Sequence, residues 1–496
     1  MNRDPEFGEG FEGLGETGRR QLLKAMGASL SLAGLSACSS DQPDQRALPY
    51  VRAPEFMVPN QARHYATAVA TLGGYAQPVL GSTQMGRPTK LEGLPGHLCS
   101  QGAADAFAQA SILGLYDPGR SQSVHKAGQI SDWNAFDAAM TENARRLDAT
   151  GGAGLRLLTA QETSPTLIRQ VEAMRARWPG LRWHMFEPAG DEDRRAAARA
   201  SFGRPLDALP RLDLAEVVVS LDDDLLGPGP QQTRNGRLWS LRRQGFQRGD
   251  GQSLLFCAEP TPSLTGVAAQ GRLAIAHARI ALLTQALAAR FDLSPAPQGL
   301  TDREAQWVQA TSKALAAAHG KALVTAGAQH PAAVQALAWR ITETLGGIGT
   351  TLELRAPAAA SAERFEALVA DLRAGEVETL IILGANPVYA APADLGFAQA
   401  MGRARLSIHA GLHLDETARA AHWHAPIEHD LETWSDARAV DGTASLIQPL
   451  VRPFYPVRSR HALLEAVQGR PNADAHALVQ DTWRQALGAD FDRAWR

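Results

Sequence analysis

The stretch TLIILGANPVYA, residues 379–390, has the pattern of a buried strand that ends at a glycine and continues into Asn-Pro. Short apolar strands are typical of parallel sheets covered on both faces, and ligands bind such sheets beyond the carboxyl ends of the strands. Gly384 would let a ligand approach the backbone, and the Asn386 amide can read a base edge or a phosphate. The stretch therefore predicts a pocket at Gly384, Asn386 and Pro387. An ordinary strand-to-helix turn is the alternative, because no second glycine motif supports a pocket.

Short apolar runs alternate with helical patterns over most of the chain. The predicted strands are residues 155–159, 182–186, 216–221, 254–258, 322–326, 379–384 and 405–409. Apolar residues at three-to-four spacing predict helices over 166–178, 275–291, 303–319, 331–345 and 362–374. This order indicates parallel sheets with helices on both faces. In residues 65–92, a β-prone pattern of alternating side chains is interrupted by turn glycines, which predicts a small antiparallel unit. The charged, Gly- and Pro-rich run 187–250 predicts long surface loops.

Length and composition limit the number of folded units and the kinds of binding site that the chain can have. The chain has 496 residues, 45% hydrophobic and 20% charged, which predicts two to four folded units and excludes wholesale disorder. The net charge of -3 offers no basic field for nucleic acid. There are three cysteines, Cys38, Cys99 and Cys257. An all-cysteine cubane takes four thiolates, so this chain alone cannot hold one.

The first residues have the pattern of an export signal. Arg19 and Arg20 form a twin-arginine pair, and the weakly apolar stretch 25–35 is too short to cross a bilayer. The pair favours the twin-arginine route, which carries folded cargo. Leu35-Ser36-Ala37-Cys38 then matches a lipobox, which predicts lipid attachment at Cys38. Cleavage nearby with Cys38 discarded or free is the alternative.

Eight segments together resemble the molybdopterin-oxidoreductase superfamily, in particular the molybdopterin-like part of the large iron–sulfur subunit of alternative complex III, a bacterial quinol oxidoreductase. The segments are GRRQLLKAMGASLSLAGLSAC (18–38), ALPYVRAPEFMVPNQARHYATA (47–68), GRPTKLEGLPGH (86–97), DAFAQASILGLYDPGRSQ (105–122), TSPTL (163–167), EPTPSLTG (259–266), LGANPVYAAPADLGFAQA (383–400) and LHLDETARAAHWHAPIEHDLETWSDARAVDGTASLIQPLV (412–451). They follow the family's order over nearly the whole chain.

The resemblance implies an α/β fold: a small β-rich domain plus two doubly wound α/β domains of the formate dehydrogenase/DMSO reductase-like type. The domains that we expect are a signal at 1–37, an extended tether at 38–63, a β-rich cluster-domain remnant at 64–125, a first α/β region at 126–320, a second at 321–450 and a C-terminal helical segment at 451–496. Relatives continue into further domains that carry the clusters. This chain is therefore expected to depend on another chain for those domains, or to be the first half of a longer gene.

The chain departs from the catalytic pattern where redox ligands would lie. Residues 64–75, HYATAVATLGGY, contain no cysteine, and Cys99 follows Gly-Arg-Pro alone. Asp191 and Ser201 could bind molybdenum in principle, but they lie in a charged, Ala- and Arg-rich stretch that predicts a solvated helix. We therefore predict no catalytic residue, no metal ligand and no cofactor in this chain. Cys99 and Cys257 either form a disulfide or stay free.

Histidines gather near the C-terminus at 409, 413, 422, 424 and 429. His422 and His424 alternate along a predicted strand and would share one face, where zinc or copper could bind. We interpret these histidines as packing or interface residues, with a metal site as the alternative. In the family's pattern Pro426 and Glu432 line the rim of the cleft.

The resemblance implies a non-catalytic scaffold on the periplasmic face of the bacterial cytoplasmic membrane. The expected partners are an iron–sulfur ferredoxin-like domain or subunit, multihaem and monohaem cytochrome c subunits, and integral membrane quinol-binding subunits. Iron–sulfur clusters and haem c are expected in those partners. The alternatives are an active molybdenum–bis-pterin subunit with a Ser or Asp ligand, and an exported lipoprotein that binds a nucleotide-like ligand.

Overall fold

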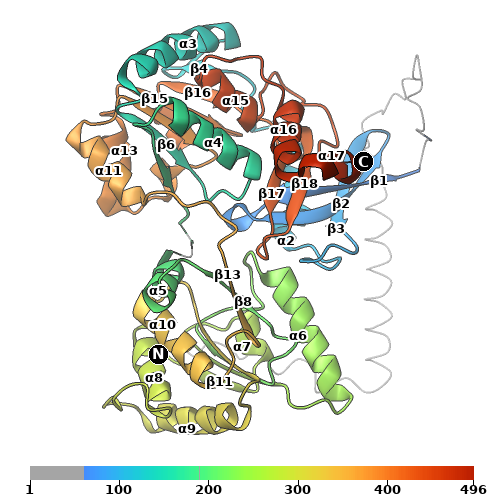
Figure 1. Cartoon of the computed structure of the whole chain (residues 1–496), viewed down its shortest axis with the longest axis vertical. Coiled ribbons are helices and arrows are strands. Elements are labelled where there is room, and N and C mark those ends of the chain that lie inside the picture. The colour runs from blue at the N-terminus through green and yellow to red at the C-terminus, as the bar shows by residue number, and fades with distance from the viewer. Residues whose placement is uncertain (1–57, 59–60, 189, 191, 496) are drawn as a thin grey trace, which may run out of the picture. The chain divides into compact units, whose positions relative to one another are not determined.

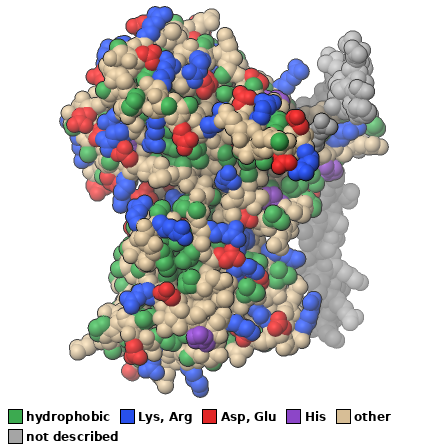
Figure 2. Space-filling view, viewed as in Figure 1, with side chains coloured by type: hydrophobic (Ala, Val, Ile, Leu, Met, Phe, Trp, Pro, Cys, Tyr) green, Lys and Arg blue, Asp and Glu red, His purple; other side chains and the backbone are tan. Residues whose placement is uncertain are grey.

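The computed structural model describes residues 58, 61–188, 190 and 192–495 (Figure 1). The predicted signal residues Arg19 and Arg20, the lipid site Cys38 and the candidate ligand Asp191 lie outside these residues. Among the helices that are described, none combines the length and apolar character needed to cross a membrane. Basic and acidic side chains are interspersed on the face shown in Figure 2.

A seven-stranded sheet in the order β5-β4-β16-β15-β14-β6-β7 forms the first α/β half (Figure 1). The strands are β5 (Gln129–Ile130), β4 (His125–Lys126), β16 (Trp423–Pro426), β15 (Leu406–Gly411), β14 (Thr379–Leu383), β6 (Leu155–Thr159) and β7 (Arg182–Met185). The five strands from β16 to β7 run parallel. The pairings of β4 with β16 and of β4 with β5 are antiparallel.

Helices cover both faces of this sheet, because successive residues of its strands point to opposite faces and are apolar on each. On β14, Ile381 packs with α3 (Trp133–Thr150), α4 (Pro165–Arg177) and α15 (Arg460–Val467). Its neighbours Leu380 and Ile382 point the other way, toward α11 (Phe365–Ala374) and α13 (Phe397–Met401). Alternation along one strand therefore produces a three-layer arrangement.

The second half is a parallel sheet in the order β11-β10-β9-β12. The strands are β11 (Gly271–Ala274), β10 (Leu254–Glu259), β9 (Val217–Leu221) and β12 (Ala322–Ala326). One core contains residues of α8 (Ile280–Ala289) and α9 (Asp302–Ala317), and the opposite core contains residues of α5 (Glu192–Phe202) and α6 (Gln232–Gln247). Helix α10 (Ala332–Thr344) contributes to both cores.

A small β unit completes the fold. Strands β1 (Arg63–Ala70), β2 (Ala76–Gln84) and β3 (Arg87–Gly93) are antiparallel, as predicted for 65–92. Helix α2 (Ala106–Leu115) and the hairpin β17 (Ser435–Arg438) and β18 (Ala444–Ile447) pack on this unit. The other elements are β8 (Asp207–Pro210) paired with β13 (Leu352–Arg355), α7 (Leu264–Ala268), α12 (Pro387–Ala390), α14 (Glu416–Ala420), α16 (Ala475–Leu487) and α17 (Phe491–Trp495).

Each predicted strand is present to within a residue or two. The predicted helix over 275–291 begins only at Ile280, because residues 277–279 form a 3-10 turn after β11. The run 187–250 contains the strand predicted at 216–221, which is β9, and the helix predicted around Ser201, which is α5. It also contains β8 and α6, where only surface loops were predicted. Helix α6 is polar in composition, yet it buries Leu238 and Trp239 together with the side chains of Arg234 and Arg242.

The two sheets are interleaved along the chain, which differs from the linear division at residues 320 and 321. The seven-stranded sheet takes strands both from residues 125–185 and from residues 379–426. The four-stranded sheet uses the segment between them. Parallel strands can be far apart in sequence because crossovers join them, so sequence order does not define the sheets.

Candidate functional site

A cavity of about 390 Å³ lies at the carboxyl edge of the four-stranded sheet. Its wall includes Asp222 after β9, Glu259 at the end of β10 and Gln329 after β12. Tyr75 and Gln161, from outside that sheet, line it as well. This is the edge where doubly wound sheets bind ligands, because loops from adjacent parallel strands converge there.

The cavity wall is acidic. The carboxylate side chains that line it are Glu187, Asp207, Asp222, Asp223, Asp224 and Glu259, whereas Arg194 is the one guanidinium in the described lining. Asp223 pairs with Arg194 at 3.3 Å. Asp207 and Glu259 pair with Arg195 and Arg272, so arginines offset part of the negative charge, and the remainder attracts cations.

Glu259 is a carboxylate of the cavity wall that is ionised although it is buried. Burial alone would raise the pKa of Glu259, but hydrogen bonds from Ser263 and Arg272 outweigh burial and hold that pKa below its ordinary value. Arg272 Nε lies 2.5 Å from the carboxylate. The Glu259 carboxylate is therefore ionised at neutral pH.

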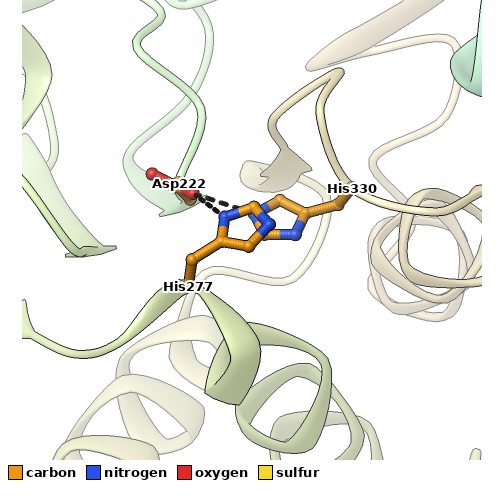
Figure 3. Close-up of side chains that lie close together, drawn as sticks. All are labelled: Asp222, His277 and His330. Atoms are coloured by element: carbon orange, nitrogen blue, oxygen red, sulfur yellow. Dashed lines mark hydrogen bonds and ion pairs between the residues drawn. The ribbon is translucent and has the colours of Figure 1, made fainter. Parts of the chain in front are cut away.

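Asp222, His277 and His330 meet at the edge of this cavity (Figure 3). Asp222 Oδ2 lies 3.2 Å from His277 Nδ1 and 3.0 Å from His330 Nε2. The two imidazoles are stacked, with ring centroids 4.4 Å apart. The His330 side chain is only 2% exposed, and burial lowers its pKa. His277 is 54% exposed, so the group is closed on one side and open on the other.

The sheet topology explains how three distant residues converge. Asp222 directly follows β9, His330 comes four residues after β12, and His277 lies in the turn after β11. Asp222 adopts a left-handed backbone with φ of 56°, which aspartate tolerates better than most residues. None of these three residues was predicted from the sequence. The available signal was that each residue follows a strand end of one parallel sheet.

The predicted pocket residues Gly384, Asn386 and Pro387 lie beyond β14, in the other sheet, and are not part of this cavity wall. Gly384 has a φ of 68°, as the turn requires. The Asn386 amide serves the chain itself: its Oδ1 accepts from the Thr417 hydroxyl at 2.7 Å, and its Nδ2 donates to Glu416 at 2.8 Å. These bonds tie α12 to α14.

Among the residues that the structure describes, the cysteines and the cavity wall do not fit an iron–sulfur cluster or a molybdenum–pterin group. Cys99 and Cys257 are both free and buried. Burial raises the pKa of Cys99 to about 11 and that of Cys257 to about 12, so both are protonated thiols in the metal-free chain. Ser201 is exposed on α5. Six carboxylates with one arginine in the described lining do not suit the pyrophosphates of two pterin dinucleotides.

The C-terminal histidines have partners within the chain. His424 is 1% exposed, with its Nδ1 3.0 Å from His409 Nδ1 and its Nε2 2.8 Å from Ser121 Oγ. His422, in contrast, is exposed and its Nδ1 meets the Ser407 hydroxyl at 2.8 Å. His422 and His424, for which a metal site was the alternative, therefore have separate environments. Glu432 pairs with Arg120 in a buried ion pair.

The free energy of unfolding is expected to fall as the pH falls from 6.5 toward 3, in part through His424. Burial, then the neighbouring His409 and His125, lower the pKa of His424 to about 3. Between these values the unfolded chain binds a proton at this residue and the folded chain does not, so stability decreases by up to about 1.4 kcal/mol per pH unit. Urea unfolding at several pH values should show a shallower dependence for His424→Gln. An unchanged slope would show that the folded imidazole is protonated.

Comparisons with known proteins support the fold. No protein-family model matches the sequence, and no curated protein matches it. Among solved structures, the chain is similar to acetylene hydratase from Pelobacter acetylenicus, with a TM-score of 0.59 and 10% sequence identity. The match covers 87% of this chain and 70% of that chain. Two α/β halves and a small β unit are thus arranged as in a known enzyme, and the chain has a molybdopterin-oxidoreductase-like fold.

Proposed function

We propose that this chain is a non-catalytic molybdopterin-like scaffold subunit of an alternative-complex-III-type membrane quinol oxidoreductase. Its role in respiratory electron transfer is to hold the iron–sulfur and c-type cytochrome partners near the integral membrane quinol-binding subunits. Twin-arginine export and a lipid on Cys38 would place it on the periplasmic face of the cytoplasmic membrane. The clusters and haems belong to the partner chains.

One observation carries the proposal: a molybdopterin-oxidoreductase-like fold is combined with a cluster region, residues 64–75, that contains no cysteine. The acidic cavity supports it, since a site selected for two pyrophosphate-bearing cofactors would present cations rather than six carboxylates. The two described cysteines support it as well, because both are buried and neither belongs to a group of described side chains that could share a metal ion.

Affinity purification of the intact complex through this chain tests the proposal. We expect mass spectrometry to identify haem c and iron–sulfur partners, and metal analysis to find no molybdenum or tungsten and no pterin released by acid. A cell that carries Arg19→Lys with Arg20→Lys is the control, because a blocked export route should yield this chain without haem partners. One molybdenum or tungsten per chain would overturn the scaffold role and favour the active pterin enzyme. Recovery of the exported chain alone would favour the ligand-binding lipoprotein.

A further inference from the structure

The three side chains at the cavity edge have donor atoms at spacings that suit one metal ion. The ligand atoms of Asp222, His277 and His330 all lie within 4.8 Å of one another. In a tetrahedral zinc site with bonds of about 2.0–2.2 Å, ligand atoms are about 3.3–3.6 Å apart. The two distances from Asp222 Oδ2, 3.0 and 3.2 Å, are within a few tenths of an ångström of that spacing. Small side-chain rotations would therefore admit an ion among the three atoms.

The ligand set selects a class of ion. Two imidazoles with one carboxylate suit divalent first-row transition metals, whereas calcium and magnesium prefer oxygen ligands alone. Both imidazole nitrogens already point at the carboxylate oxygen (Figure 3). Metal binding would replace the two N–H protons that now form these hydrogen bonds.

The surroundings hold the carboxylate in place. The Asp222 backbone N–H donates to the Ala258 carbonyl at 2.7 Å, and the Asp222 carbonyl accepts from Gln329 Nε2 at 2.6 Å. His330 is buried, so its ring has little freedom. Asp222 also lines the cavity, which leaves a route for a fourth ligand from that side, and the acidic wall raises the local concentration of cations.

We propose that Asp222, His277 and His330 bind one divalent transition-metal ion of the zinc type at the edge of the cavity. The proposal does not depend on the scaffold role, because a scaffold and an enzyme could each carry this ion. It differs from the prediction from sequence that the chain holds no metal ligand, and zinc binding would decide between the two.

Zinc titration of the full chain tests the site. The protein is purified without a histidine tag, stripped with a chelator and titrated with Zn²⁺ by calorimetry, with bound zinc counted by metal analysis. We expect one zinc per wild-type chain. His277→Gln and Asp222→Asn should each weaken binding at least about tenfold, since even outer-shell partners of metal ligands contribute 10–100-fold. His277 is half-exposed, so its replacement should leave the circular dichroism spectrum unchanged.

His413→Gln is the matched control. His413 Nε2 lies 3.0 Å from Asp117 Oδ2, which reproduces one half of the proposed site without a second imidazole. Zinc affinity should be unchanged in this variant. The proposal is overturned if the wild-type chain binds no zinc, or if His277→Gln binds zinc as tightly as the wild type.

Discussion

Glu432→Ala is expected to lower the free energy of unfolding by about 3–5 kcal/mol, because it leaves a buried guanidinium without its partner. Arg120 and Glu432 are 312 residues apart in sequence, and their side chains are 1% and 0% exposed. Two hydrogen bonds of 3.1 and 2.5 Å join them. The Glu432 carboxylate also accepts from the backbone N–H groups of His429 and Phe454. One substitution therefore removes an ion pair and two further hydrogen bonds.

Urea unfolding at pH 7 measures this effect. Arg145→Ala is the control, since the Arg145–Glu142 pair is 74% and 60% exposed and its loss should change stability by less than about 1 kcal/mol. Burial would raise the pKa of Glu432, but Arg120 and the backbone N–H groups hold it below the ordinary 4.5. The contribution of Glu432 is thus present above pH 4.5 and is lost as the pH falls through the lowered pKa. Equal losses in the two variants would contradict the role of the buried pair.

Asp436→Ala should cost at least about 3 kcal/mol, because hydrogen bonds to a charged acceptor contribute about 1.5–3 kcal/mol each. Asp436 on β17 is fully buried. Its carboxylate accepts from the Ser164 hydroxyl at 2.5 Å and the Thr166 hydroxyl at 2.6 Å, at the start of α4. It also accepts from Trp483 Nε1 on α16 at 2.9 Å. The substitution would leave donors on two helices without an acceptor.

Asp474→Ala is the matched control for this prediction. Asp474 caps the N-terminus of α16 through the Ala477 N–H and is solvent-accessible, so its loss should cost only about 1 kcal/mol. Urea unfolding, with tryptophan fluorescence as the readout, compares the variants. A smaller loss for Asp436→Ala than for Asp474→Ala would show that the buried carboxylate does not hold the two helices.

The strands could be predicted because their signal is local. An apolar run such as 322–326 or 379–383 has few alternatives to a buried strand, and the structure places β12 and β14 there. Helix α6 could not be predicted in the same way. Its packing depends on two apolar side chains and on two arginines whose burial requires partners far away in sequence, so the polar run resembles a loop.

At the candidate site, too, local features could be predicted from the sequence, but contacts between distant segments could not. Local pattern was enough to place a polar turn after β14, because Gly384 and Pro387 act on their own backbone. The use of the Asn386 amide depended on α14, 30 residues later, and the sequence could not show it. Asp222, His277 and His330 belong to one site only because β11, β9 and β12 lie in a single parallel sheet with their carboxyl ends together. Backbone preference acts between neighbours in sequence, whereas strand order depends on how crossovers pack, and that order brought the two histidines to one aspartate.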